Sequence, residues 1–113
     1  MTVEGQKNDA GKARVDLLPP RPLIEIAEVL AFGCEKYDAW NWSKGIKASR
    51  LFGALLRHLW AWWSGEDNDR ETGKSHLAHA GCCLLFLADQ RHRMPDMDDR
   101  PKGLCAPAFG EHQ

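Results

Sequence analysis

The sequence predicts an all-α protein, a small helical bundle built around a central antiparallel hairpin of two helices. Apolar residues recur at helical spacing in three segments, and no segment alternates polar and apolar residues with the period of two that marks a half-buried strand. With 113 residues, the chain is long enough for one hydrophobic core and too short for two. We expect a single domain with an extended polar arm over residues 1–22, a helical core over 23–90 and an irregular polar tail over 91–113.

The arm leads into the first helix through a run of prolines. Residues 19–22 read Pro-Pro-Arg-Pro, which suits an extended segment placed just before a helix start. Beyond it the apolar residues stand at positions i, i+3, i+4 and i+7 of an amphipathic helix: Leu23, Ile26, Ala27 and Leu30. Gly33 weakens that helix, and residues 38–45 then suit an ordered loop.

The next two helices form the predicted hairpin. We expect Ser49 to cap a helix over residues 50–64, and Ser75 to cap another that runs to about Gln90. Both are apolar on several sides, which is the pattern of a helix buried in a core or against another subunit. Because one small monomer cannot hide that much apolar surface, we expect the bundle to be completed by self-association as a homodimer or homotetramer.

Composition excludes several classes of protein. Fifteen Lys and Arg against sixteen Asp and Glu give a net charge of −1, so we expect no nucleic-acid polymer as partner. No run approaches the roughly 18 apolar residues of a membrane helix, and the first residues lack a signal-peptide pattern, so we expect a cytoplasmic protein without a membrane partner. The four cysteines match neither a disulfide framework nor a zinc motif, and we expect reduced, buried thiols.

An acidic segment, residues 65–74, is the first candidate site. Four carboxylates fall within six positions, and clustered oxygen ligands suit Mg²⁺ or Mn²⁺. They are Glu66, Asp67, Asp69 and Glu71. The segment lacks the glycine and the final glutamate of an EF-hand loop. A solvated surface turn is the alternative interpretation.

Three histidines lie next to this segment in the predicted hairpin. His76 and His79 are three residues apart on the third helix and therefore face the same way. If the hairpin turns near Asp69, His58 lies at about the same level as His79 on the facing helix. Each could be a hydrogen-bonded core residue, but their convergence also suits metal ligands, a general base or a substrate-positioning group.

Cations and aromatic residues complete the candidate site. Lysines and arginines are spread over the arm, the first loop and the second helix, while Trp40, Asn41 and Trp42 offer flat surface and amide hydrogen bonds. Cations beside a carboxylate cluster suit an anionic ligand that carries a metal ion. Neither a P-loop nor a dinucleotide-binding motif is present. These features favour an all-helical, metal-dependent enzyme that acts on a phosphorylated small molecule.

Three segments, over about residues 7–90, carry a resemblance to a known family: GKARVDLLPP, FGCEKYDAWNW and RHLWAWWSGEDNDRETGKSHLAHA. The chain resembles the phage dATP/dGTP diphosphohydrolases, small all-α nucleotide pyrophosphohydrolases related to the MazG-like enzymes. The resemblance implies a MazG-like fold and a Mg²⁺- or Mn²⁺-dependent hydrolysis of purine deoxynucleoside triphosphates, dGTP and dATP, to the monophosphate and pyrophosphate. It also implies a place in phage nucleotide metabolism.

MazG-like enzymes carry their metal on an ExxE…ExxD pattern across a helix hairpin, and this chain departs from it. The facing positions hold an arginine and histidines in place of paired acids, so the ligands cannot be transferred by motif. We expect the metal ligands to be carboxylates: Glu35, Asp38, Glu66, Asp67, Asp69 and Glu71. We expect Glu66, Asp69 and His79 to be catalytic. The expected substrate-binding residues are Lys12, Arg14, Lys36, Asn41, Trp42, Arg50 and His58.

Three other classes of protein fit parts of the sequence. A non-catalytic helical nucleotide-binding or assembly protein would need the aromatic loop and the apolar helices but not the acidic segment. A phosphohydrolase of the HD type would use His58, His76 and His79, but that class needs an adjacent His-Asp pair, which the chain lacks. A structural zinc module is disfavoured by the cysteine spacing.

Overall fold

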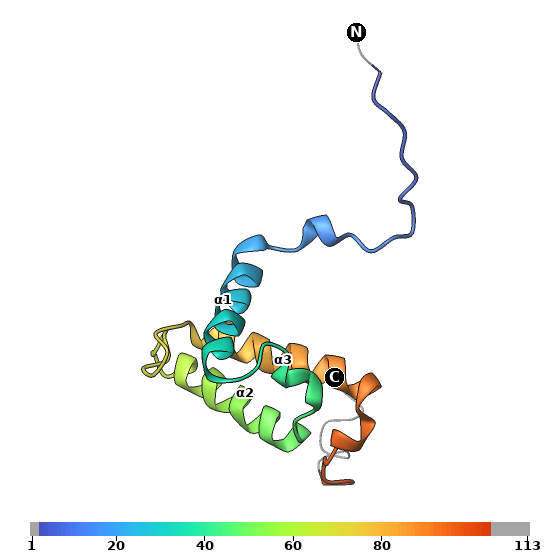
Figure 1. Ribbon diagram of the computed structural model, residues 1–113. Helices are drawn as coiled ribbons and strands as arrows, with labels where there is room; N and C mark the ends of the chain where they lie inside the picture. Colours follow the sequence, from blue (N-terminus) through green and yellow to red (C-terminus); the bar gives the residue numbers. More distant parts are fainter. Residues whose placement is uncertain (1–2, 105–113) are drawn as a thin grey trace.

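The computed structural model describes residues 3–104, and this part of the chain is all-helical, as predicted (Figure 1). It contains three α-helices and three short 3₁₀ turns: η1 (Val15–Leu17), α1 (Pro20–Lys36), η2 (Asn41–Lys44), α2 (Ala48–Trp63), α3 (His76–Arg93) and η3 (Pro95–Met97). Helices α2 and α3 pack side by side as the predicted antiparallel hairpin, and α1 packs across α3. Within the described residues no helix is both long and apolar enough to cross a membrane.

Helix α1 begins earlier and ends later than its apolar pattern predicts. It starts at Pro20, three residues before Leu23, because proline at the first helical position needs no hydrogen-bonded N–H and already has a helical φ. The helix then continues through Gly33, whose carbonyl accepts the backbone N–H of Tyr37 at 2.8 Å. Packing of Val29 and its neighbours against α3 outweighs the weak helix preference of this one glycine.

The predicted cap of α2 is wrong. The helix begins at Ala48 with Lys47 at its N-cap position, and Ser49 lies inside the first turn. The backbone N–H of Ser49 instead donates to Asp99 in the tail. The cap therefore comes from a residue fifty positions away, which local sequence does not reveal.

The predicted start of α3 is confirmed. The hydroxyl of Ser75 accepts the backbone N–H groups of Leu77 and Ala78, which is a helix N-cap. The helix ends at Arg93, three residues beyond Gln90, and its last turn is basic. Gly81 lies where α1 crosses, and a Cβ there would stand 2.7 Å from the Ile26 side chain. This glycine therefore permits the close approach of the two helices.

The hydrophobic core of the described residues is small. Val29, Ala78 and Cys82 form a buried cluster, against which Ile26, Leu30 and Phe86 pack. The outer side of α2 is not covered: Phe52, Trp60 and Trp63 are 53%, 63% and 80% exposed. Within a single chain, α2 is therefore buried on the side that faces α3 and exposed on its outer side, so the prediction of a buried helix holds for one side only.

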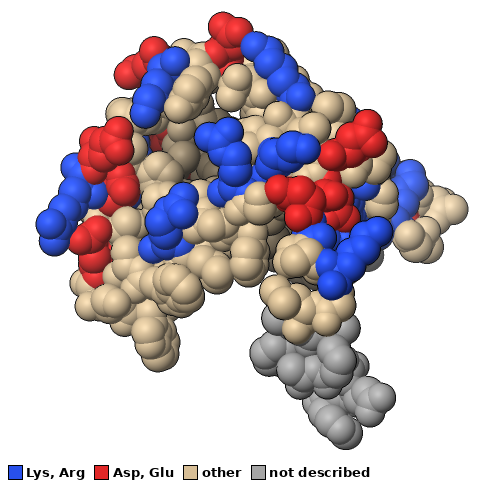
Figure 2. Space-filling model, turned by 90° about the horizontal axis from the view of Figure 1, so that it is seen from below, with Lys and Arg blue, Asp and Glu red and all other residues tan. Residues whose placement is uncertain are grey.

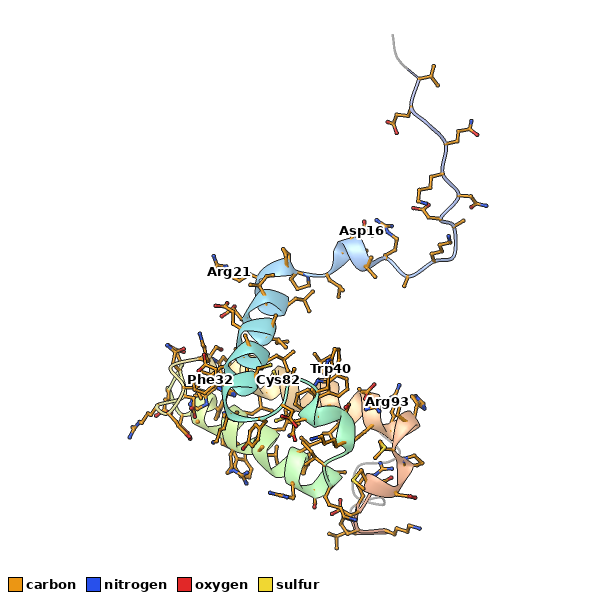
Figure 3. All side chains as sticks on the ribbon, in the orientation of Figure 1. Asp16, Arg21, Phe32, Trp40, Cys82 and Arg93 are labelled. Atoms are coloured by element: carbon orange, nitrogen blue, oxygen red, sulfur yellow. The ribbon has the colours of Figure 1, made fainter. Side chains whose placement is uncertain are left out.

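The loop between α1 and α2 is fastened to the end of α3. The buried Gln90 side chain donates to the carbonyl of Ile46 at 2.6 Å and accepts its N–H at 3.2 Å. Arg93 donates to the carbonyl of Ser43. The arm, in contrast, extends away from the hairpin, as the positions of Asp16 and Arg21 show in Figure 3. Residues of the predicted tail beyond 104, including Cys105, lie outside the described residues.

Candidate functional site

A cavity of about 570 Å³ lies between α1, the loop that follows it and the hairpin. Its volume lies in the range that accommodates small-molecule ligands. Its polar wall is lined by Lys36, Asp38, Asn41, Arg57, His58, Asp69, Glu71, Thr72 and His79. Its apolar wall includes Val29, Leu30, Phe32, Trp42, Ile46, Cys82 and Phe86. The cavity thus joins the predicted acidic, histidine and aromatic features in one place.

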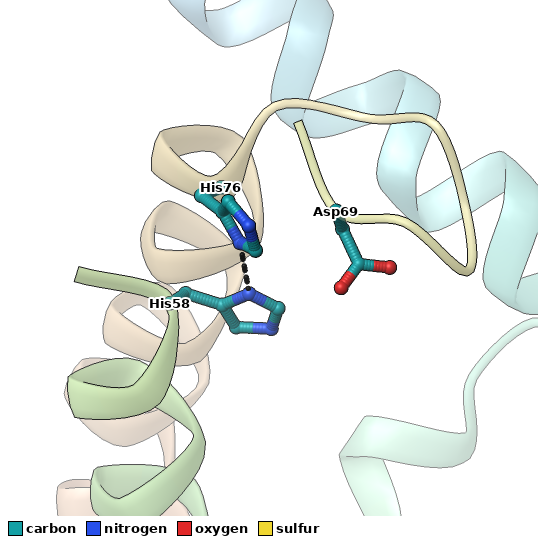
Figure 4. A group of neighbouring side chains, drawn as sticks. All are labelled: His58, Asp69 and His76. Carbon is teal, nitrogen blue, oxygen red and sulfur yellow. Dashed lines mark hydrogen bonds between the residues drawn. The ribbon is translucent and has the colours of Figure 1, made fainter. Parts of the chain in front are cut away.

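The three histidines converge, as the predicted hairpin register requires. The rings of His58 and His79 stack with their centroids 4.5 Å apart and their planes 9° from parallel. The Nδ1 atoms of His58 and His76 are 2.9 Å apart (Figure 4). His76 lies in the first turn of α3 and is only 4% exposed, so the cluster is held inside the hairpin rather than on its surface.

Glu66 closes the cluster on the far side of His76. Its Oε1 atom is 2.7 Å from His76 Nε2, and its Oε2 atom accepts Arg70 Nε at 3.0 Å. The hydrogen bond with His76 is the main reason that the pKa of Glu66 lies below its ordinary value. Glu66 is therefore a carboxylate, and a carboxylate can only accept the hydrogen bond from His76.

Asp69 lies on the segment between α2 and α3, opposite the imidazoles in Figure 4. Burial would raise its pKa, but hydrogen bonds from Thr72 and the nearby histidines lower the pKa below its ordinary value. Its Oδ2 atom accepts the backbone N–H of Thr72 at 2.9 Å. The Thr72 hydroxyl is 2.8 Å from His79 Nε2, so one short turn places both Asp69 and His79.

Burial lowers the pKa of both histidines that face the cavity. The pKa of His58 falls further because of the neighbouring His79 and His76, and that of His79 falls although Asp69 opposes the change. Both rings are therefore neutral at pH 7, since an ordinary histidine titrates near 6.5. A neutral imidazole keeps one nitrogen lone pair, which can bind a metal ion or take a proton.

One group of side chains can hold a metal ion in the described part of the chain. His58, Asp69 and His76 each offer a donor atom, and these atoms lie within 4.8 Å of one another. The other predicted carboxylate ligands are not part of this group, although Asp38 and Glu71 line the same cavity. Glu71 pairs with Lys36 at 3.7 Å and Asp38 with Lys44 at 3.0 Å, while Glu66 contacts His76. Glu35 and Asp67 are exposed.

The predicted substrate-binding residues divide into two groups. Four of them line the cavity: Lys36, Asn41, Trp42 and His58. Lys12 and Arg14 lie on the arm, where Arg14 pairs with Asp16 at 2.8 Å, and Arg50 is exposed in the first turn of α2 away from the cavity lining.

Several lining residues were not predicted as site residues, among them Arg57, Thr72 and Phe86. The adjacency of Arg57 to His58 is a signal that could have indicated it. No sequence signal marks Phe86 as a site residue, because an aromatic residue on an apolar helix is normally part of the core. It stacks on Trp42, with the centroids 5.7 Å apart and the planes 8° from parallel.

Charge is mixed on the outer surface. Figure 2 shows lysine and arginine side chains interspersed with aspartate and glutamate on the face that it presents. No continuous patch of one sign covers this face, so its charge pattern gives no sign of a broad polyanion-binding surface.

Comparison with known proteins identifies the family. A family model described as "dATP/dGTP diphosphohydrolase, N-terminal" matches residues 2–100. A protein named dATP/dGTP diphosphohydrolase from Salmonella phage PMBT28 is 39% identical over 109 residues, which are 96% of this chain and 37% of that protein. The chain thus spans little more than a third of the length of this relative, and no solved structure matches it. The chain belongs to the dATP/dGTP diphosphohydrolase family, corresponding to its N-terminal domain.

Proposed function

We propose that this protein hydrolyses purine deoxynucleoside triphosphates, dGTP and dATP, to the monophosphate and pyrophosphate in the cavity described above. The observation that carries the proposal is the convergence of two neutral imidazoles and the Asp69 carboxylate on one wall, with cations beside them. The phage relative, which aligns with 96% of this chain, is named dATP/dGTP diphosphohydrolase, and this name supports the substrate class.

The lining combines cations with an aromatic and an amide side chain, which are the groups that a nucleotide needs. Lys36 and Arg57 are the cations of the lining and suit the phosphate groups. Asn41 and Trp42 also line the cavity and suit the base, since an amide can hydrogen-bond a base edge. Because Trp42 already stacks on Phe86, it serves as a fixed wall against which the base is positioned.

A divalent ion, Mg²⁺ or Mn²⁺, belongs to this proposal. The donor set fits a cation, because two imidazole nitrogens and a carboxylate oxygen lie within 4.8 Å of one another. His58, Asp69 and His76 would hold the ion. Once bound, it would polarise the phosphoryl group and lower the pKa of a water molecule.

His79 is the proposed proton acceptor. Its lowered pKa leaves it neutral at pH 7, and it lies in the cavity wall, stacked on His58. The Thr72 hydroxyl accepts the backbone N–H of Lys74 at 3.1 Å and can accept the Nε2–H of His79 at 2.8 Å, which leaves the lone pair on His79 Nδ1 free. Such a bond fixes the imidazole ring, so His79 can take the proton that the attacking water releases.

A second copy of this chain is the proposed protein partner. Phe52, Trp60 and Trp63 lie on one side of α2 and remain exposed within one chain. Covering this face with the same face of another copy would complete a helical bundle as a homodimer or homotetramer. We also propose that the enzyme acts in the cytoplasm, where deoxynucleoside triphosphates are made.

Product analysis tests the proposed activity. Purified protein is incubated with each of the four deoxynucleoside triphosphates and Mg²⁺ or Mn²⁺, and the products are separated by anion exchange. We expect deoxynucleoside monophosphate and pyrophosphate from dGTP or dATP, and their loss with a chelator. Asp69→Asn should abolish turnover, whereas Asp96→Asn, an exposed aspartate on η3, should retain it.

Other products would contradict parts of the proposal. Release of diphosphate and free phosphate would refute the assigned bond. A folded protein that binds nucleotides but turns over none of the four would be a nucleotide-binding module, the alternative that the sequence leaves open.

A further inference from the structure

We infer that the cation site formed by His58, Asp69 and His76 at the edge of the cavity is selective for a nitrogen-binding transition metal such as Mn²⁺, Co²⁺ or Zn²⁺ over Mg²⁺, and that Glu66 is the positioning residue that aims His76 at the ion. The inference rests on the proposed function only in placing a metal in the cavity. The arrangement of the side chains adds the class of metal and the role of Glu66.

The first step is the state of His76. Its Nε2 atom is 2.7 Å from Oε1 of Glu66, and a carboxylate can only accept, so Nε2 carries the hydrogen. In the neutral ring the other nitrogen, Nδ1, is then a bare lone pair. This is the arrangement of metal-binding histidines, which donate their second N–H to a carboxylate.

The second step is the distance between the two imidazoles. His76 Nδ1 lies 2.9 Å from Nδ1 of His58. Two nitrogens that occupy neighbouring positions of an octahedral ion, each about 2.1 Å from it, stand about 3.0 Å apart. The two nitrogens are therefore spaced as neighbouring ligands of one ion, and Asp69 belongs to the same group, whose donor atoms all lie within 4.8 Å of one another.

The donor set determines the class of metal that the site prefers. Mg²⁺ prefers oxygen ligands and retains several waters, whereas imidazole nitrogen suits Mn²⁺ less strongly than Co²⁺ or Zn²⁺ but still better than Mg²⁺. The nearby carboxylates that would make an oxygen-rich site are occupied: Glu66 by His76 and Arg70, and Glu71 by Lys36. Two nitrogens and one oxygen remain.

The same distance also fits a simple hydrogen bond from His58 to His76, with no ion between them. In that arrangement the three residues form a proton relay from His58 to Glu66. The two arrangements predict different metal affinities, so a binding experiment without nucleotide distinguishes them.

The experiment is a metal titration of the full chain in the absence of nucleotide. Co²⁺ binding is followed by its visible absorption bands, and Mn²⁺ and Mg²⁺ binding by calorimetry. We expect one site that binds Mn²⁺ and Co²⁺ at least tenfold more tightly than Mg²⁺. His58→Gln and Asp69→Asn should each remove the Co²⁺ bands, since each deletes a donor.

Glu66→Gln tests the positioning role. The amide still fits but no longer accepts a charge-assisted hydrogen bond, so Co²⁺ affinity should fall by about tenfold or more. Glu28→Gln, at an exposed position of α1, is the matched control and should leave affinity unchanged. Circular dichroism of each metal-free variant establishes that it is folded.

Three outcomes would overturn the inference. They are equal affinity for Mg²⁺ and Mn²⁺, absence of Co²⁺ binding by the folded chain, and losses at Asp67→Asn or Glu71→Gln as large as those at His58→Gln. Because no nucleotide is present, the metal site can stand while the proposed hydrolysis fails. Hydrolysis can equally stand, with Mg²⁺ on carboxylates, while this site fails.

Discussion

Asp99 caps helix α2 from a distance of fifty residues in sequence. Its Oδ1 atom accepts the backbone N–H of Ser49 at 2.8 Å, and its Oδ2 atom accepts the hydroxyl of the same residue. The residue at the N-cap position, Lys47, makes no side-chain capping bond. The segment after α3 is thereby fastened to the start of α2, at the end of the hairpin away from the histidines.

Removal of this cap should destabilise the fold. Asp99→Ala leaves the first-turn N–H of Ser49 without its acceptor, and loss of a helix cap lowers stability. We expect the thermal midpoint to fall by several degrees in a calorimetric scan. Asp96→Ala, an exposed aspartate on η3 without a side-chain hydrogen bond to α2, is the matched control. Equal midpoints for the two variants would refute the capping role.

The same carboxylate gives this cap a pH dependence. The hydrogen bonds from Ser49 lower the pKa of Asp99 below its ordinary value. Its stabilising effect is therefore complete above the unfolded pKa of about 3.9 and is lost as the pH falls through the lower folded pKa. The difference in midpoint between wild type and Asp99→Ala should accordingly shrink only in strong acid.

Gln90 should prove important for both stability and substrate binding. It is 4% exposed and hydrogen-bonds both backbone groups of Ile46, so Gln90→Leu leaves those groups without partners. An unsatisfied buried polar group costs about 1–3 kcal/mol. We expect a loss of about 2 kcal/mol in urea unfolding. Gln90→Leu should also loosen the loop that carries Trp42, the proposed base-binding residue. Because this change affects substrate binding more than the chemical step, KM should rise more than kcat falls. A change in neither stability nor KM would contradict this role.

The fold was largely predictable because its signals are local. Helical spacing of apolar residues and the capping serine at Ser75 are properties of neighbouring residues, and both are confirmed. The start of α1 lies three residues before Leu23, because prolines occupy its first turn and the apolar pattern begins only after them. The cap of α2 could not be predicted, because its acceptor comes from another part of the chain.

The site was predictable in its location but not in its contacts. The sequence predicts that His58 and His79 lie at the same level on facing helices, and their stacked rings confirm this position. Proximity in sequence suggested that the acidic residues share one ion. In the structure their side chains instead turn to different partners, His76 for Glu66 and Lys36 for Glu71. Such choices depend on side-chain directions that sequence spacing does not fix.

Arg57 should contribute to binding of the phosphate groups. It lines the cavity next to His58, and no described acidic side chain pairs with it. Its guanidinium lies over Gly53, where a Cβ would stand 3.1 Å from Nη1. Loss of a charged hydrogen bond costs about 1.5–3 kcal/mol, so Arg57→Ala should lower kcat/KM by roughly 10- to 100-fold.

Inorganic triphosphate separates a phosphate contact from a structural role of Arg57. It should compete with dGTP for the wild type and much less for Arg57→Ala, while both proteins keep the same thermal midpoint. Arg21→Ala, at an exposed position of α1 away from the hairpin (Figure 3), should behave as wild type. Equal competition in wild type and Arg57→Ala would place the phosphates elsewhere.

The thiols should differ in reactivity and in pH dependence. Burial raises the pKa of Cys82 to about 11 and also raises that of Cys83, whereas Cys34 is exposed. Since the thiolate is the reactive form, iodoacetamide at pH 8 should modify Cys34 faster than the peptide that carries Cys82 and Cys83. Peptide mass mapping measures both rates. In urea the two rates should become similar. Equal rates in the folded protein would contradict the burial of Cys82 and Cys83.

These raised pKa values also affect stability in alkali. An unfolded thiol ionises near pH 8.5, while folded Cys82 stays protonated to about pH 11. Stability is therefore complete below pH 8.5 and falls as the pH rises towards 11, because the unfolded state releases its proton first. The thermal midpoint should accordingly be lower at pH 10 than at pH 8, and less so in Cys82→Ala.

Substitutions on the outer face of α2 should separate self-association from folding. Trp60 and Trp63 are 63% and 80% exposed in one chain, so replacing both with Gln removes little packing within that chain. If a second copy covers this face, the double variant should become monomeric in size exclusion with light scattering, while its circular dichroism stays unchanged. Trp40→Gln, 68% exposed on the first loop, is the matched control and should keep the wild-type mass. A monomeric wild type, or a double variant with the wild-type mass, would show that this apolar face is not the contact between copies.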